Sequence, residues 1–212
     1  MVKCGRPCKG DEQLSRDRLL DSARQLFLEY SYGNLTMETI AKDAHVSLRT
    51  IYSQFGGKAG LFGAVIRRYS DQFVGTLARD KPLEEALLTF ARQFLQSMTL
   101  PEIIRIRAIL IAESPRFPEL ALQFYEQGPR RTLNYLAEFF KFQQAAGRIA
   151  PFDAEFLAEQ YLSLLRGEQY YRLQLGLELP PCDAKICDLA EQATQLFLHG
   201  CLLATPTDKT AP

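Results

Sequence analysis

Two short amphipathic segments, separated by a brief turn, form the most informative pattern of apolar and polar positions in this sequence. Thr36 precedes residues 37–44, and Ser47 precedes residues 48–54. A hydroxyl directly before a helix can accept a hydrogen bond from an unpaired backbone N–H of the first turn. The pattern predicts two helices that begin after Thr36 and Ser47. Apolar pairs with the spacing of a hydrophobic staple flank both starts, namely Leu35 with Ile40 and Val46 with Ile51.

A helix, a turn of about three residues and a second helix form a helix-turn-helix unit, whose second helix enters the major groove of DNA. On that helix Ile51 and Phe55 lie four residues apart and are expected to face inward. The other side chains stay available to water or to base edges, and we assign base contacts to Arg49 and Thr50. A helical hairpin that only packs is the alternative interpretation, which the repeated cap-and-staple pattern disfavours.

Phosphate contacts are expected at the edges of this unit. Tyr52 lies at the flank of the second helix, where a phenol can reach a phosphate oxygen. Lys58 begins the next helix, where backbone N–H groups and a cation together attract phosphate. Arg6 lies in a basic arm that either follows the minor groove of bound DNA or is a solvated terminus. The predicted DNA-contacting residues are Arg6, Thr36, Ser47, Leu48, Arg49, Thr50, Tyr52, Ser53 and Lys58.

Residues 14–61 resemble the DNA-binding domain of the tetracycline-repressor (TetR) family of one-component transcriptional regulators. The resemblance implies an operator DNA partner and favours repression over activation. His45 stands where the family usually has glycine, although histidine tolerates a left-handed turn better than most residues. Ala59-Gly60 replaces the usual acidic pair, which predicts a looser start of the following helix. The motifs that carry the resemblance are Ala23-Arg24-Gln25-Leu26-Phe27, Thr36-Met37-Glu38-Thr39-Ile40-Ala41, Val46-Ser47, Ile51-Tyr52-Ser53-Gln54-Phe55, Lys58 and Leu61-Phe62.

The rest of the chain shows helical periodicity without a strand pattern or an internal repeat. A first helix is expected from Ser15 to a left-handed cap at Gly33, and Gly147 is a further expected cap. The predicted fold is all-α, with an N-terminal three-helix helix-turn-helix domain and a C-terminal helical bundle for ligand binding and dimerisation. Further helices are expected near residues 58–73, 82–95, 101–113, 117–127, 130–146, 153–175 and 183–203. The expected boundaries are 1–13 for a flexible basic arm, 14–60 for the DNA-binding domain, 61–204 for the helical domain and 205–212 for a polar tail.

The net charge of zero hides a segregation of charge along the chain. Residues 1–79 contain 12 Lys and Arg against 8 Asp and Glu, a net charge of +4, and residues 80–212 carry the compensating −4. A basic N-terminal part that contains the helix-turn-helix fits a nucleic-acid partner. A mixed surface gives such a split by chance as well, so the charge supports the assignment without carrying it.

The compartment expected from the sequence is the cytoplasm, and no membrane is expected as a partner. No apolar run approaches the roughly 20 residues that span a bilayer, and no secretory signal is recognisable at the N-terminus. The cysteines are odd in number, and reduced thiols are the default for a chain of this size. No cofactor and no metal is expected, although the spacing of the cysteines leaves a redox or metal role open. The cysteines are Cys4, Cys8, Cys182, Cys187 and Cys201.

The last two helices are the predicted dimer interface. A two-fold dimer reads two half-sites about 34–36 Å apart, so a surface outside the helix-turn-helix must hold the symmetry. The resemblance implies a four-helix interface there, and packing within one subunit is the alternative for the same apolar faces. The residues assigned to the interface are Leu157, Leu164, Tyr171, Leu189, Ala193, Leu196 and Phe197.

The middle helices are the predicted pocket for a small, largely apolar or aromatic effector. The aromatic side chains in this set also have an alternative assignment as plain core. Glu113 ends a buried apolar run and therefore needs a partner, which is either a ligand or a surface salt bridge with Arg116 or Arg107. The predicted pocket residues are Ile106, Leu110, Glu113, Phe124, Tyr135, Phe139, Tyr161, Leu165, Glu168 and Gln169, with Arg166 as a further polar candidate.

Three functional classes follow from these patterns. The first is a ligand-responsive, homodimeric repressor released from a palindromic operator, with an activator of the same fold as a variant. The second is an enzyme, which the sequence does not favour because it contains no nucleophile motif, no His-Glu metal helix and no glycine-rich phosphate loop. The third is a helical interaction adaptor without DNA binding, which the intact Thr36, Tyr52 and Lys58 disfavour.

Overall fold

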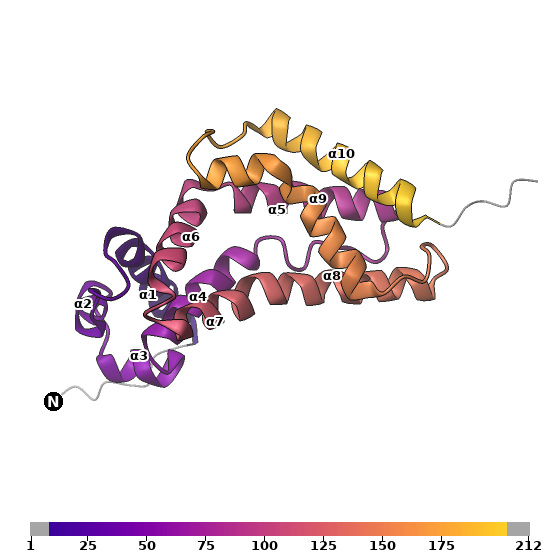
Figure 1. The fold of residues 1–212 in the computed structure, drawn as a ribbon. Helices are drawn as coiled ribbons and strands as arrows, with labels where there is room; N and C mark the ends of the chain where they lie inside the picture. Colours follow the sequence, from indigo (N-terminus) through magenta and orange to yellow (C-terminus); the bar gives the residue numbers. More distant parts are fainter. Residues whose placement is uncertain (1–8, 203–212) are drawn as a thin grey trace, which may run out of the picture. The chain divides into compact units, whose positions relative to one another are not determined.

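The computed structural model describes residues 9–202 of the chain, with side chains from Gln13 onward (Figure 1). This range is all helical, apart from one isolated bridge between Ile149 and Leu202. The predicted all-α class is confirmed. Arg6, Cys4, Cys8 and the expected polar tail lie outside the described residues.

The helices follow one another with short connections. The helix-turn-helix and its flanking helices are α1 (Lys9–Glu29), α2 (Met37–Asp43), α3 (Leu48–Phe55) and α4 (Lys58–Ser70). The remaining elements are α5 (Leu83–Met98), α6 (Pro101–Glu113), α7 (Pro118–Tyr125), the π-helix η1 (Glu126–Arg130), α8 (Arg131–Ala145), α9 (Ala154–Gln174) and α10 (Asp183–Cys201).

Three expected helix ends can be compared with the structure. Helix α1 begins at Lys9 rather than Ser15, so residues 9–13 of the expected arm are helical. The same helix ends at Glu29, and Gly33 does not adopt the left-handed conformation expected of a cap. At Gly147 the expectation is correct: φ is +67°, and the chain closes α8 with Arg148 N–H bonded to Gln143 O at 3.0 Å.

The chain forms two compact units. Unit 1 contains the residues up to Tyr69 together with Arg105–Gly128, and unit 2 contains Ser70–Ile104 and the residues from Pro129 onward. The division differs from the expected boundary after residue 60, because α4 and the segment that carries α7 group with the helix-turn-helix.

Glycines explain why α7 belongs to unit 1. A methyl group built on Gly63 of α4 would meet the Gln123 side chain of α7 at 2.5 Å, and one on Gly128 would meet Ile66 at 3.1 Å. Backbones approach this closely only where a side chain is missing. Aromatic contacts add to the packing, since the ring of Tyr32 meets Phe117 edge-on at 5.2 Å between centroids.

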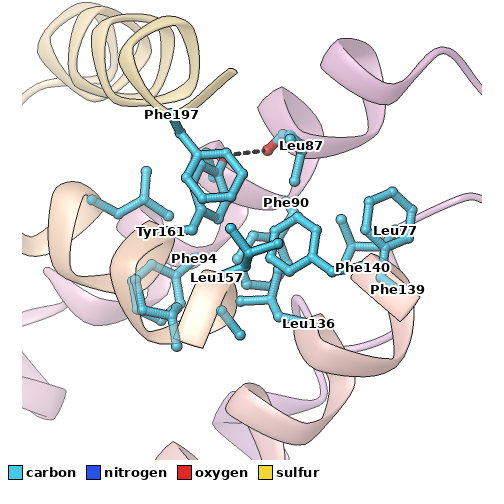
Figure 2. Close-up of a cluster of buried hydrophobic side chains, with 14 of the residues drawn as sticks. Leu77, Leu87, Phe90, Phe94, Leu136, Phe139, Phe140, Leu157, Tyr161 and Phe197 are labelled. Atoms are coloured by element: carbon cyan, nitrogen blue, oxygen red, sulfur yellow. Dashed lines mark hydrogen bonds between the residues drawn. The ribbon is translucent and has the colours of Figure 1, made fainter. Parts of the chain in front are cut away.

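Unit 2 is built around an aromatic core drawn from α5, α8, α9 and α10 (Figure 2). Helix α9 packs against α8, and α10 packs against α5 and α9. The fully buried Tyr161 lies at the centre, with its ring 4.9 Å from that of Phe197. Its hydroxyl donates to Leu87 O at 3.0 Å and lies 2.8 Å from Thr194 Oγ1, so the one polar atom is satisfied.

The described residues form neither a membrane-spanning helix nor a cluster of metal ligands. None of the helices from α1 to α10 has an apolar stretch of the length needed to cross a bilayer. Among the same residues, no group of three or more His, Cys, Asp or Glu side chains is placed to hold a metal ion. Cys182 is exposed and Cys201 is buried, and burial raises the pKa of the Cys201 thiol.

Candidate nucleic-acid interface

Both short helices of the helix-turn-helix begin at the predicted caps. Thr36 Oγ1 accepts from Thr39 N–H at 3.2 Å, and Ser47 Oγ accepts from Thr50 N–H at 3.0 Å. Both cap residues have extended backbone angles, as N-caps require. Two helices of seven and eight residues are marginal by themselves, so these local bonds fix where each one starts.

The turn between the two helices is tight and left-handed. His45 has φ +54° and is the only non-glycine residue with positive φ among the described residues. Its position matches the expected left-handed turn. Helix α3 ends at Phe55 and is capped by Gly56, which has φ +74° and donates its N–H to Tyr52 O at 2.9 Å.

The outer face of α3 is available for contact. Ile51 is fully buried, whereas Arg49, Ser53 and Gln54 are exposed. Tyr52 is 52% exposed, so its phenol can reach outward from the flank. The structure thus presents Leu48–Phe55 as a helix anchored by one apolar side chain with its polar side free, which is the geometry that base readout needs.

The small hydroxyl side chains on α3 already have partners. Thr50 Oγ1 lies 2.8 Å from Ser47 Oγ, and Ser53 Oγ donates to Thr50 O at 3.0 Å. Thr50 and Leu48 are half-buried. Arg49 therefore offers the least encumbered donors on this face, and a guanidinium suits the bidentate recognition of guanine.

The Lys58 side chain makes contacts within the protein that its position in the sequence did not indicate. Its Nζ donates to Tyr32 O at 2.5 Å and to Leu35 O at 2.8 Å, and it lies 4.3 Å from the centroid of the Tyr32 ring. Burial lowers the pKa of Lys58, while the nearby carboxylates of Glu113 and Glu119 oppose that shift. The ammonium has three donors, so one remains after the two carbonyls are satisfied. Lys58 thus ties the start of α4 to the turn before α2.

Two glycines, Gly60 and Gly33, matter here because of close contacts that the sequence did not reveal. A methyl group on Gly60 would overlap the carbonyl oxygen of Phe55, so only glycine allows α4 to start this close to the end of α3. A methyl group on Gly33 would meet the Phe117 ring at 3.2 Å. A glycine inside a helical pattern is a sign of close packing in the sequence, but the sequence does not show that Gly60 packs against the carbonyl of Phe55.

The sequence and the fold match known proteins along nearly the whole chain. Residues 19–65 match the tetR family of bacterial regulatory proteins, and residues 85–200 match the C-terminal domain of the AefR-like transcriptional repressors. The second match alone spans more than half of the chain. The chain belongs to the TetR family of transcriptional regulators. Its family is therefore one of regulators and not of enzymes.

Individual relatives agree with this placement. The HTH-type transcriptional regulator YvkB of Bacillus subtilis is 27% identical over 187 residues, which cover 86% of this chain and 95% of YvkB. The structure of the flavonoid-responsive regulator FrrA is 35% identical, with a TM-score of 0.72 over 91% of this chain and all of FrrA. A TetR-family regulator of Mesorhizobium loti shares the fold with a TM-score of 0.75 at 24% identity, over 93% of this chain and all of the other.

In this TetR-family chain the predicted effector residues are divided between the two units. Ile106, Leu110, Glu113 and Phe124 belong to unit 1, and the other six belong to unit 2. In unit 2, Phe139 and Leu165 are buried in the same core as Tyr161, and the Tyr161 hydroxyl is satisfied within the protein. These three side chains therefore belong to the packed core, a role that helical periodicity in the sequence cannot distinguish from lining a pocket.

The polar effector candidates lie in different surroundings. Glu113 Oε2 is buried without a hydrogen-bond partner, so neither expected salt bridge satisfies it. Glu168 is exposed and 3.8 Å from Arg172, whereas Gln169 lines a small cleft with Leu165 and Arg166 that has room for little more than one water molecule. The Tyr135 hydroxyl accepts from Leu77 N–H at 3.0 Å.

The predicted dimer-interface residues also separate into two groups. Leu157, Ala193 and Phe197 are at most 8% exposed and pack in the core of unit 2, so their side chains are not offered to a partner. Leu189 is half-buried against the same core. Leu164, Tyr171 and Leu196 are 37%, 62% and 63% exposed, which leaves these three as the outward apolar part of the set.

Proposed function

We propose that the chain is a homodimeric repressor that binds a palindromic operator through α3 and releases it when a small aromatic effector binds. The observation that carries the DNA-binding part is the exposed polar face of α3, held in place by the Ser47 cap and by buried Ile51. Arg49 and Thr50 contact bases, and Thr36, Tyr52 and Lys58 contact phosphates. Such a regulator acts on chromosomal DNA in the cytoplasm.

The DNA-binding proposal is tested with the promoter DNA next to the protein's own gene. A mobility shift should show a discrete complex, and Arg49→Ala should cost about 1–3 kcal/mol at one base pair and relax selectivity there. Lys141→Ala is the matched control, because Lys141 is an exposed unit 2 cation paired with Glu138. If Arg49→Ala bound both the operator and a scrambled duplex with the same affinities as the wild type, the assignment of Arg49 to a base contact would be rejected.

The dimer proposal rests on the exposed apolar side chains of α9 and α10. Leu164 and Tyr171 are exposed on α9, one on each side of the break in the helix at Gly167, and Leu196 is exposed on α10. Exposed large apolar groups of this kind mark interaction surfaces. Leu164→Glu should give a monomer by light scattering at micromolar protein, while Leu14→Glu, at a more exposed apolar position of unit 1, should leave the dimer intact.

The effector proposal draws on the similarity to FrrA, whose responsiveness to flavonoids is stated in its name. At 35% identity over 91% of this chain, an aromatic effector of related chemistry is the most economical expectation. The test is release of the operator by a flavonoid in the mobility shift. A reporter gene under the same promoter distinguishes repression, in which expression rises on deletion of the regulator, from activation, in which it falls.

A further inference from the structure

Helix α5 carries two buried polar groups that the protein itself leaves unsatisfied. Gln93 Oε1 and Ser97 Oγ are both inaccessible to solvent and have no hydrogen-bond partner within the described part of the chain. Ser97 as a whole is only 2% exposed. Buried polar atoms without partners are rare in native proteins, because each one loses its bonds to water without replacement.

The two groups differ from other unsatisfied atoms of unit 2. Arg92 Nε and Gln143 Nε2 are also unpaired, but Arg92 binds Glu191 at 2.7 Å and Gln143 accepts from Arg148 at 2.5 Å through other atoms of the same side chains. For Gln93 and Ser97 the structure provides no such anchor. Their polar atoms are therefore not by-products of an existing ion pair or side-chain bond.

Ser97 has also not taken the local partner that similar residues use. On the same helix Thr89 Oγ1 donates to Glu85 O at 2.8 Å, and at its C-cap Thr99 Oγ1 donates to Leu95 O at 2.7 Å. In both cases the hydroxyl is bonded to the carbonyl four residues earlier. The Ser97 hydroxyl does not make the corresponding bond to the carbonyl of Gln93.

The positions of the two groups define one small polar spot in apolar surroundings. Gln93 and Ser97 lie four residues apart, so they neighbour each other on one face of α5 with Cβ atoms about 5–6 Å apart. Phe90 and Phe94, on the adjoining face, are buried and stacked at 5.7 Å between centroids, with Phe73 edge-on to both. A molecule that reaches the spot therefore meets an amide oxygen, a hydroxyl and otherwise apolar side chains.

We propose that Gln93 Oε1 and Ser97 Oγ are the polar anchors for a hydroxylated aromatic effector, an inference that rests on the effector-responsive function proposed above. One phenolic hydroxyl can donate to Gln93 Oε1 and accept from the Ser97 hydroxyl, which satisfies both groups at once. A methyl ether or an unsubstituted ring has no O–H group to donate to the amide oxygen of Gln93. A carboxylate oxygen is itself an acceptor and would be repelled by that amide oxygen. The effector is thus an aromatic compound selected by at least one free hydroxyl.

Direct binding of matched flavones to the full-length protein tests the hydroxyl requirement. Flavone, the set of monohydroxyflavones and their methyl ethers differ only in the donor. The wild type should bind at least one hydroxyflavone roughly tenfold or more tighter than both flavone and the corresponding ether, as expected for one buried hydrogen bond. Ser97→Ala and Gln93→Met should each remove most of this preference while leaving the affinity for flavone unchanged or higher.

A matched control and a ligand-free measurement complete the test. Thr89→Val removes an α5 hydroxyl that is bonded within the helix, and it should leave the hydroxyl preference as in the wild type. Without ligand, Ser97→Ala and Gln93→Met should each raise Tm by about 2–4 °C, because an unsatisfied polar atom is removed.

Each contrary result has a distinct meaning. A lowered Tm in both variants, equal affinities for the three flavone types, or no flavone binding by the wild type would overturn the anchor. A failed mobility shift with the promoter DNA would instead reject the proposed regulatory function, since direct ligand binding is measured without DNA.

Discussion

Units 1 and 2 hold their helices in different ways. In unit 1 the two helices of the helix-turn-helix have seven and eight residues, and each starts at a hydroxyl cap. In unit 2 the helices α5, α8, α9 and α10 span 15 to 21 residues, with a break in α9 at Gly167, and they converge on a shared aromatic core (Figure 2). Short helices need local bonds to exist at all, whereas long ones are stabilised by the faces they bury. The first arrangement leaves one side of α3 free. The second buries the helix faces that line the core, while Leu164, Tyr171 and Leu196 stay exposed.

The largest expected effect comes from a cavity in the core of unit 2. Phe90 is fully buried among Phe73, Phe94 and Tyr161. Phe90→Ala should lower the free energy of unfolding by about 3–5 kcal/mol, measured by urea denaturation at a fixed protein concentration. Phe90→Leu, which keeps most of the volume, is the control. A loss below about 1 kcal/mol for the alanine variant would contradict the dependence of unit 2 on this core.

The next effect concerns the close approach of α3 and α4 in unit 1. Gly60→Ala places a methyl group on the Phe55 carbonyl oxygen, so α4 or the end of α3 must shift, at a cost of about 1–3 kcal/mol in unfolding. Affinity for the operator should fall as well, because α3 is displaced. Gly200→Ala is the control: this glycine of α10 has no atom within 4 Å of the added methyl and should be neutral or slightly stabilising.

A smaller effect compares one cap from each unit. Ser47→Ala removes the bond to Thr50 N–H, and Asp153→Ala removes the bond of its carboxylate to Phe156 N–H at 2.8 Å. Each should cost about 0.5–2 kcal/mol in unfolding. Only Ser47→Ala should also weaken operator binding in the mobility shift, with Ser47→Asp restoring most of it. Equal losses of DNA affinity in both variants would show that the caps act through global stability alone.

The smallest effect is the pH dependence that Lys58 contributes. Because burial lowers the pKa of Lys58 in the folded state, the unfolded chain binds this proton more tightly. The contribution of Lys58 to stability should therefore rise with pH between its lowered folded pKa and its ordinary value of 10.5. Urea unfolding of wild type and Lys58→Met at pH 7.5 and pH 10 measures this, and the wild type should gain relative to the variant. A relative loss on alkalinisation would contradict the burial of the ammonium.

Much of unit 1 could be predicted because its determinants are local. The bonds of Thr36 and Ser47 reach three residues along the chain, so spacing alone reveals them. The same holds for the left-handed turn at His45 and for the burial of Ile51 beneath an exposed Arg49. The domain family followed from the same residues, because they carry the helix-turn-helix itself.

The determinants that escaped prediction lie between residues far apart in the chain. Lys58 binds carbonyls 26 and 23 residues earlier, and the Gly63 backbone is matched to Gln123 some 60 residues later. No periodic pattern encodes such partners. The apolar faces of α9 and α10 illustrate the same limit, since an amphipathic helix looks alike whether it packs against its own subunit or another.

The sequence by itself determined the all-α class, the caps and turn of the helix-turn-helix and the family, since these rest on bonds within a few residues and on helical periodicity. Only the tertiary structure decided that Leu157, Ala193 and Phe197 are core, that Lys58 is tied to the turn before α2, and that the oxygens of Gln93 and Ser97 are left without partners. The physical reason is that burial and pairing depend on which helices meet, and that is settled by packing over the whole unit.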